Sequence, residues 1–327
     1  MQALSATRLA GLWLGGVVVI VLVIALGVLV GTTSVGWPSG WVLEYRLGRS
    51  CLAAFVGIAL ATAGVGYQAV LRNPLAEPYL LGVSGGAALA VFAWSLPGVV
   101  LGGWLATVGR EVAGFVGGMA AVAMVLTLAG VRGRLDPSRL LLVGVVVGIF
   151  AGGLFALLVQ LTREPSGGAM SFLFGRIGDP TTGELVRLTI VTAVLVATLA
   201  LLSGPAAMLA AGEEEARASG VRVDASRWAI VIVASLLAST ATAASGPIGF
   251  VGLMAPHLAR LVVGVDVRRV LPTAAAIGAG LLVLSDALGR LSAMLLGSEI
   301  AAGVVTNLIG GPFFLLLLSR TTRRTGR

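Results

Sequence analysis

The sequence predicts an all-α integral membrane protein that forms a single domain over residues 1–327. Of its 327 residues 57% are hydrophobic and only 11% are charged, and the mean hydropathy is +1.03. A soluble domain is about a quarter charged. The 47 glycines agree with this class, because small residues let helix backbones approach one another closely in lipid.

The apolar runs predict about ten membrane-spanning helices. A run of roughly 20 apolar residues is long enough for one crossing as a helix. The first run is longer than the apolar core of a secretory signal, so we expect a retained span. The ten predicted spans cover residues 10–30, 47–70, 79–97, 102–131, 140–161, 184–203, 228–244, 248–263, 270–289 and 300–318.

Two of the polar segments between these spans have distinctive sequences. Between the second and third spans, Pro74 and Pro78 favour a stiff turn, because proline lacks an N–H donor and disfavours helix in the residue before it. Residues 204–227 form the longest polar segment, and three glutamates from Glu213 suit the positive end of a short helix. Gly220 suits the position just past its end. The pattern fits either a solvated surface helix or a helix that docks on a partner.

The basic residues predict the orientation of the chain. All 22 are arginine, so a Walker A phosphate loop, which needs lysine, is excluded, as is a Schiff-base lysine. With the N-terminus in the cytoplasm, ten spans place 15 arginines on the cytoplasmic side and 6 outside, and the remaining one, Arg290, lies near the end of the ninth span. The positive-inside rule prefers this arrangement, with both termini cytoplasmic. The net charge of +8 therefore reflects membrane topology, and we expect no nucleic-acid partner.

Ser84 and His257 raise the alternative of an intramembrane serine protease. Ser84 lies in a Gly-Val-Ser-Gly segment and His257 is the only histidine; a base that takes the hydroxyl proton would activate the serine. The other interpretation is that the glycines around Ser84 let helices pack while its hydroxyl bonds to backbone. Ten spans favour the packing interpretation.

Two further patterns concern the helices themselves. Asp286 and Arg290 are four residues apart on one helix face, and we predict that they pair, because an unpaired charge deep in the membrane costs about 2.5–3.5 kcal/mol. Gly144, Gly148 and Gly152 recur every four residues in the fifth span. Such a stripe is typical of helix packing and would also suit a dimer axis.

Several segments together resemble the FecCD-type permeases, the membrane subunits of type II ABC importers for ferric siderophores, haem and cobalamin. The matching segments extend from the second span to the tenth. They are Arg46–Arg49, Arg72–Pro78, Gly82–Ala87, Gly212–Val221, Ser245–Arg260, Asp286–Arg290 and Glu299–Phe314.

The resemblance implies a BtuC-like permease fold in a multi-pass protein of the bacterial inner (cytoplasmic) membrane. It implies a homodimer with the substrate path on its axis, two ATPase subunits at the cytoplasmic face and a periplasmic substrate-binding protein outside. The chain would then be no enzyme and would bind no cofactor or metal of its own. ATP and magnesium would belong to the partner ATPase.

The resemblance also assigns roles to residues at both ends of the bundle. Outer arginines would meet carboxylates of the binding protein, residues 213–220 would form the coupling helix in the ATPase groove, and two cytoplasmic turns would form the inner gate. The docking residues are Arg46, Arg49 and Arg290; the coupling residues are Glu213, Glu214, Glu215, Ala216, Arg217, Ala218, Ser219 and Gly220; the gate residues are Asn73, Leu75, Pro137 and Ser138; the axis residues are Gly144, Gly148 and Gly152.

The expected mechanism is alternating access, in which docking and ATP binding shift the membrane halves between two states. A path with few charges suits a bulky, weakly hydrated cargo. Outer arginines would attract haem propionates, which favours haem over ferric siderophores and cobalamin. The alternative is an ion-coupled secondary transporter, which needs ionisable residues near the midplane; Asp286 and Glu299 come nearest, and both lie toward the end of a span.

Overall fold

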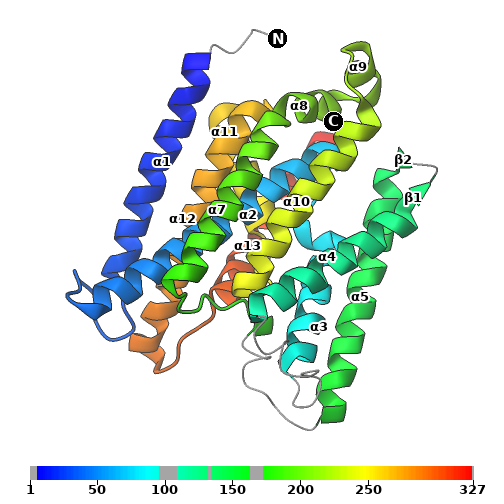
Figure 1. The fold of residues 1–327 in the computed structure, drawn as a ribbon. Coiled ribbons are helices and arrows are strands. Elements are labelled where there is room, and N and C mark those ends of the chain that lie inside the picture. Colours follow the sequence, from blue (N-terminus) through cyan, green and yellow to red (C-terminus); the bar gives the residue numbers. More distant parts are fainter. Residues whose placement is uncertain (1–5, 96–108, 132–133, 163–171, 326–327) are drawn as a thin grey trace.

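The computed structural model describes residues 6–95, 109–131, 134–162 and 172–325, and these are almost entirely helical (Figure 1). The helices are α1 (Ala6–Leu29), α2 (Trp41–Leu71), η1 (Pro78–Leu81), α3 (Val83–Ser95), α4 (Arg110–Ala129), α5 (Pro137–Thr162), α7 (Thr182–Leu201), α8 (Ser203–Ala211), α9 (Glu213–Ala218), α10 (Val223–Ser245), α11 (Val251–Val263), α12 (Val267–Leu296) and α13 (Ala302–Thr325). Strands β1 (Gly130–Val131) and β2 (Arg134–Leu135) form a small antiparallel hairpin before α5.

The predicted membrane segments are confirmed as helices. Among the described residues seven helices are long and apolar enough to cross a membrane, and three shorter apolar helices lie in α3, α11 and α13. Each corresponds to one of the ten predicted spans. Residues 96–97 of the third predicted span and residues 102–108 of the fourth lie outside the described residues.

Several helices extend past their apolar runs. α2 begins at Trp41, inside the segment between the first two predicted spans, because Gly40 adopts φ 58° and lets the chain turn directly into the helix. α12 continues to Leu296, beyond the predicted end at residue 289, and carries Arg290 as a buried, paired side chain. Hydropathy alone predicts the end of a helix where polar residues begin. It therefore misses helical residues whose charged side chains are buried in ion pairs.

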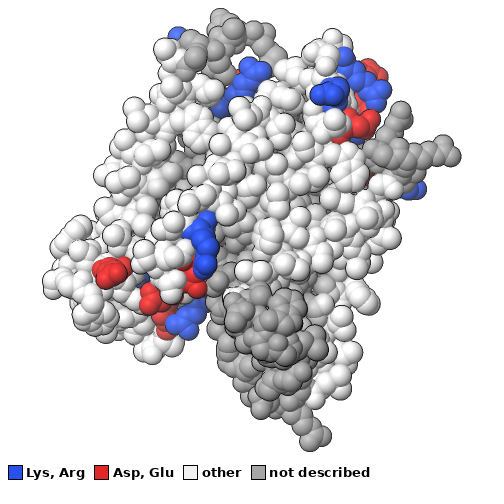
Figure 2. Space-filling model, in the orientation of Figure 1, with Lys and Arg blue, Asp and Glu red and all other residues white. Residues whose placement is uncertain are grey.

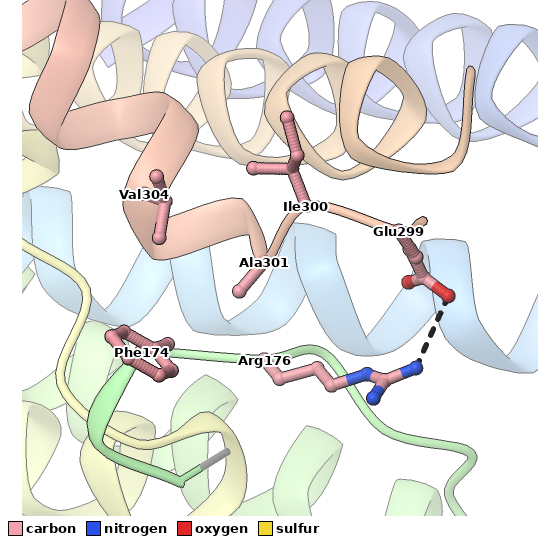
Figure 3. Close-up of a pocket in the computed structure, with 6 residues that line it drawn as sticks. All are labelled: Phe174, Arg176, Glu299, Ile300, Ala301 and Val304. Atoms are coloured by element: carbon pink, nitrogen blue, oxygen red, sulfur yellow. Dashed lines mark hydrogen bonds and ion pairs between the residues drawn. The ribbon is translucent and has the colours of Figure 1, made fainter. Parts of the chain in front are cut away.

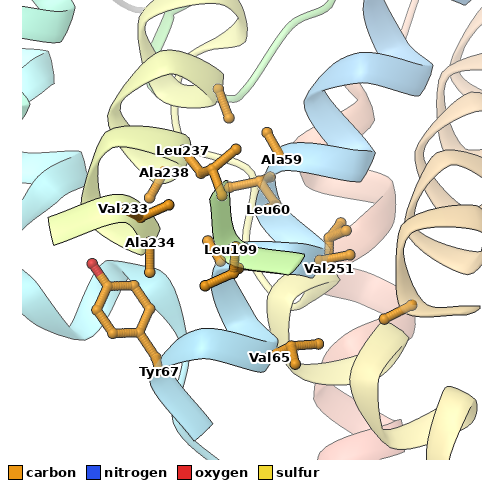
Figure 4. Close-up of a cluster of buried hydrophobic side chains, with 14 of the residues drawn as sticks. Ala59, Leu60, Val65, Tyr67, Leu199, Val233, Ala234, Leu237, Ala238 and Val251 are labelled. Carbon is orange, nitrogen blue, oxygen red and sulfur yellow. The ribbon is translucent and has the colours of Figure 1, made fainter. Parts of the chain in front are cut away.

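Helix α2 is the centre of the bundle. Its most apolar stretch is 83% buried, and it packs against α10, α11 and α12. The backbones approach so closely that a Cβ on Gly57 would lie 2.2 Å from the Gly278 carbonyl oxygen, and a Cβ on Gly64 would lie 1.9 Å from that of Gly252. Only glycine fits at these crossings. Around them, aliphatic and aromatic side chains of α2, α7, α10 and α11 form the core drawn in Figure 4.

The two ends of the bundle carry most of the charged side chains. We call them the α9 end and the Arg49 end. Helix α1 begins and α13 finishes at the same end as α9, whereas the turn from α12 to α13 lies at the opposite end (Figure 1). On the face shown in Figure 2, charged side chains gather toward these ends and the surface between them is largely uncharged. This distribution is the one expected of a protein that spans a bilayer.

Helices α1, α5 and α7 form much of the exposed apolar surface. Only 11% of the most apolar stretch of α1 is buried, and the corresponding stretches of α5 and α7 are similarly exposed. On α5, the exposed side chains include Leu142, Ile149 and Phe150. Such faces suit contact with lipid or with a second chain.

Candidate functional sites

Charged residues from three regions of the sequence form one cluster at the Arg49 end. We call Arg49, Arg176, Asp286, Arg290 and Glu299 the rim cluster. The carboxylate of Asp286 accepts from Arg49 at 2.7 Å and lies 3.0 Å from Arg290 Nε. Glu299, between α12 and α13, binds Arg49 through one oxygen and Arg176 through the other, the latter at 3.2 Å. The predicted Asp286–Arg290 pair is therefore confirmed.

Arg46 and Arg290 connect the rim to the segment between α1 and α2. Arg46 donates to the backbone carbonyls of Val28, Ser34 and Gly36 at 3.2 Å. Arg290 donates to the Gly27 carbonyl at 3.0 Å and also to that of Val30. The carbonyls of Gly27 and Val28 lie in the last turn of α1, where i+4 helical donors are missing, and the two arginines supply donors to them.

All three arginines predicted to meet a partner protein are buried in this arrangement. Arg46, Arg49 and Arg290 are 5%, 3% and 1% exposed, and their donors serve groups of this chain. Sequence topology places them correctly at one end but does not show this burial. Their contact with a partner stays a prediction.

Arg176 is the accessible member of the rim cluster, with 52% of its side chain exposed. It lines a pocket of about 270 Å³ with Phe174, Glu299 and Ala301. Figure 3 shows its guanidinium reaching Glu299 across the mouth of this pocket. Sequence reasoning missed Arg176 as a site residue. The predicted topology places Arg176 in an outer loop, on the same side as the loop that holds Glu299, and this shared position was the available signal.

The predicted short helix is present at the opposite end, as α9. It spans Glu213–Ala218, and Gly220 follows at φ 78°. The amide of Val221 donates to the Ala216 carbonyl at 3.0 Å, which closes the helix end. Ala216 is fully buried, while Arg217 and its neighbours on the outer face are exposed.

Glu213 fixes α9 to the bundle. Its carboxylate accepts from Arg217 at 2.7 Å and from Arg227 of α10 at 3.3 Å. Hydrogen bonds from Arg217 and then Arg227 hold the pKa of the Glu213 carboxyl below its ordinary value, because both favour the charged form. α9 is therefore a projecting helix with a defined attachment.

The first predicted gate turn, which holds Asn73 and Leu75, is anchored to the segment before α11. Asn73 Oδ1 accepts from the Leu75 amide at 2.9 Å, which shapes the turn. Glu77 accepts from the Phe250 amide, and Tyr79 Oη accepts from the Ile248 amide at 2.8 Å. Burial raises the pKa of the Glu77 carboxyl. Glu77 was not singled out from the sequence, although it lies between the two turn prolines.

The second predicted gate turn is the beginning of α5. Pro137 is its first helical residue, where the missing N–H costs nothing. The Asp136 carboxylate accepts from the amides of Ser138 and Arg139 at 2.8 and 3.1 Å. Both turns lie at the α9 end, and their action as one gate stays a prediction.

The glycine stripe of α5 divides into two environments. A Cβ on Gly144 would lie 2.1 Å from the Leu80 carbonyl oxygen, so this glycine lets α5 pack on η1. A Cβ on Gly148 would lie 3.5 Å from the Cα atom of Gly82. Among the described residues, no atom lies within 4 Å of a Cβ placed on Gly152, and Gly152 is exposed. The stripe therefore packs within the chain at one end and is open at the other.

Ser84 and His257 do not form a dyad. Among the described residues no hydrogen bond joins their helices α3 and α11. The His257 ring packs edge-on against Phe313, with centroids 5.7 Å apart. The protease alternative has no geometric basis here.

The fold and its ends define a class of protein, a multi-helix membrane permease with a short helix projecting from one end. The chain belongs to the FecCD transport family, whose sequence model matches residues 17–320. Members of this class are permease subunits of ABC transporters and are not enzymes, because a separate subunit hydrolyses ATP.

Two known relatives match over most of their length. The hemin transport system permease protein HmuU of Yersinia pestis is 33% identical, covering 96% of this chain and 98% of the relative. The cobalamin import system permease protein BtuC of Halobacterium salinarum is 38% identical over 84% and 72% of the two chains. A solved structure, described as an inward-facing conformation of a metal-chelate type ABC transporter, superposes with a TM-score of 0.78 at 27% identity, covering 95% and 99%.

Proposed function

We propose that this chain is the membrane subunit of a homodimeric, ATP-driven importer that carries an iron complex or cobalamin into the cytoplasm of a bacterium by alternating access. The observation that carries the proposal is the match to permeases over nearly the whole chain, joined to a projecting helix at one end of the bundle.

The proposed ATPase contact is α9. Its exposed outer residues are available to a partner, while Ala216 and the Glu213–Arg227 ion pair transmit movement to α10. α10 in turn packs on α2 along much of the bundle. A displacement of α9 would therefore reach the central helix directly.

The orientation follows from this assignment and from the arginines. With the α9 end in the cytoplasm, both ends of the chain are cytoplasmic and the excess of arginine lies inside, as the positive-inside rule requires. The Arg49 end then faces the outside of the inner membrane. Gly152 and its exposed apolar neighbours on α5 would face the second chain at the dimer axis.

The rim cluster is the proposed docking surface for a substrate-binding protein. It holds three guanidinium groups against two carboxylates, with Arg46 beside them. Charge complementarity there would set register and association rate more than affinity. Arg176 would make the first contact, and Arg46, Arg49 and Arg290 would contribute once the rim rearranges.

Haem is the cargo we propose to test first. One nearly full-length relative is named for hemin, and the cationic rim would attract propionate carboxylates. The other named cargo classes, cobalamin and metal chelates, belong to relatives of similar likeness.

ATP-dependent uptake tests the function. The permease, its ATPase and its binding protein would be reconstituted in liposomes, and haem accumulation followed with a ferric siderophore and cobalamin as competitors. We expect haem to accumulate only when ATP is present on the α9 side. If haem is the cargo, neither competitor should reduce its accumulation. Accumulation driven by an ion gradient without ATP would instead support a secondary transporter. That alternative is disfavoured because Asp286 and Glu299, its candidate coupling residues, are engaged in ion pairs at one end.

A further inference from the structure

A cavity of about 680 Å³ opens at the α9 end, between the C-terminal end of α2, helix α8 and the turn from α11 to α12. It is within the size range of small-molecule sites. Arg72, Arg260 and Arg269 line it, and among its described lining residues Asp266 alone carries a carboxylate. Asp266 caps α12 by accepting from the Arg268 amide at 3.0 Å.

The arginines of this cavity are not neutralised within the chain. Among the described residues, no carboxylate forms an ion pair with Arg72, Arg260 or Arg269. Arg260 donates one bond, from Nη2 to Gln68 Oε1 at 2.6 Å. Arg260 Nη1 and Arg269 Nε are buried and have no hydrogen-bond acceptor in the described chain. Buried donors of this kind cost free energy unless a ligand supplies acceptors.

The wall and its surroundings indicate the chemistry of that ligand. Guanidinium groups bind phosphate through paired N–H donors. Val263 and Val265 line the same cavity. Val265 and the neighbouring Leu261 and Val262 are exposed apolar side chains. A cationic cavity bordered by exposed apolar residues at the end of membrane-spanning helices fits an amphiphile with an anionic head.

We propose that this cavity binds the phosphodiester headgroup of an anionic phospholipid. The arginines hold the phosphate, and the acyl chains lie along Leu261 and Val262. Basic pockets between membrane helices bind anionic headgroups in this way. The inference rests on the helices crossing a membrane and does not depend on cargo or on the ATPase.

The test measures lipid retention on the intact complex by native mass spectrometry, with phosphatidylglycerol or phosphatidylcholine added in titration. We expect the wild-type chain to retain phosphatidylglycerol preferentially. Arg269→Gln should lower that retention about fivefold and the double variant Arg260→Gln/Arg269→Gln about twentyfold or more, because each basic group near an anionic headgroup contributes separately to its attraction. Arg269→Lys, which keeps the charge, should retain more lipid than Arg269→Gln.

The matched control is Arg139→Gln, an exposed arginine at the same end that does not line the cavity; it should retain lipid as wild type does. A thermal unfolding midpoint close to that of wild type shows that each variant is folded. Equal retention of the two lipids, or unchanged retention in the double variant, would overturn the proposal. Displacement of phosphatidylglycerol by inorganic phosphate at equal concentration would assign the cavity to a free anion. If the arginine variants lose the ATPase subunit but retain lipid as wild type does, the cavity would be assigned to carboxylates of a partner protein.

Discussion

Arg49 of α2 and Asp286 of α12, 237 residues apart in sequence, form a buried ion pair in which Arg49 Nη2 lies 2.7 Å from Asp286 Oδ1. Arg290 binds the same carboxylate from the other side. The pair joins the two helices that pack most extensively in the bundle, at the end where α1, α2 and α12 meet. Because this ion pair is buried, the rim cluster holds α2 and α12 together and is also a candidate docking surface.

Asp286→Asn should destabilise the protein strongly. Removing one partner of a buried ion pair typically costs about 3–5 kcal/mol, because the remaining charge stays buried without compensation. Thermal or chemical unfolding of the detergent-solubilised chain measures this loss. The comparison variant is Arg176→Gln, which breaks a half-exposed pair with Glu299 and should cost about 1 kcal/mol or less. Equal losses would show that the rim is not organised around Asp286.

Reversal of the rim charges should abolish uptake. Arg46→Glu combined with Arg49→Glu replaces attraction for a binding protein's carboxylates by repulsion, and we expect uptake to fall to background while the ATPase stays assembled. Both side chains are buried, so this variant also disturbs packing.

Arg176→Glu separates the two effects, because Arg176 is largely exposed. It should slow association of the binding protein at low salt, with little change in thermal stability. Normal uptake by the Arg46→Glu/Arg49→Glu variant would remove the docking assignment.

The α5 glycines should differ sharply when replaced by alanine. Gly144→Ala forces a Cβ against the Leu80 carbonyl and should cost about 1–3 kcal/mol through overpacking. The Cβ of Gly152→Ala would contact no atom in the described part of the chain, so this change should leave the monomer's stability unchanged. Gly152→Trp should weaken the homodimer if the open part of the stripe lies at its axis. A homodimer of wild-type stability in Gly152→Trp would move the interface elsewhere.

Acid should loosen α9 through Glu213. The pKa of its carboxyl is lowered in the folded chain by Arg217 and Arg227. The stabilisation is therefore present at neutral pH, and it is lost as pH falls below the ordinary glutamate value of about 4.3 and through the folded pKa. Hydrogen exchange at the Gly220 and Val221 amides, corrected for intrinsic rates, should increase a few-fold across this range. Glu213→Gln should exchange faster at neutral pH and lose the pH dependence; an unaltered profile would show that Glu213 does not hold the helix.

Local features of the structure could be predicted from the sequence. An apolar run of fixed length is a sufficient signal for a membrane helix, so all ten segments were found. The Asp286–Arg290 pair follows from i,i+4 spacing, and α9 from its glutamates and Gly220. These features depend on residues that are close together in the chain.

Tertiary features could not be predicted from the sequence. Arg49 meets Asp286 only because glycine crossings bring α2 and α12 together. Arg46 is buried because the segment after α1 folds back over it. The contact of Arg176 with Glu299, 123 residues apart, likewise depends on how two loops meet.

The native mass of the complex, gently solubilised from its source membranes, tests the importer assignment most directly. Two copies of this chain with two copies of a nucleotide-binding subunit are the predicted composition. A lone chain, or a stable homodimer without an ATPase, would contradict it.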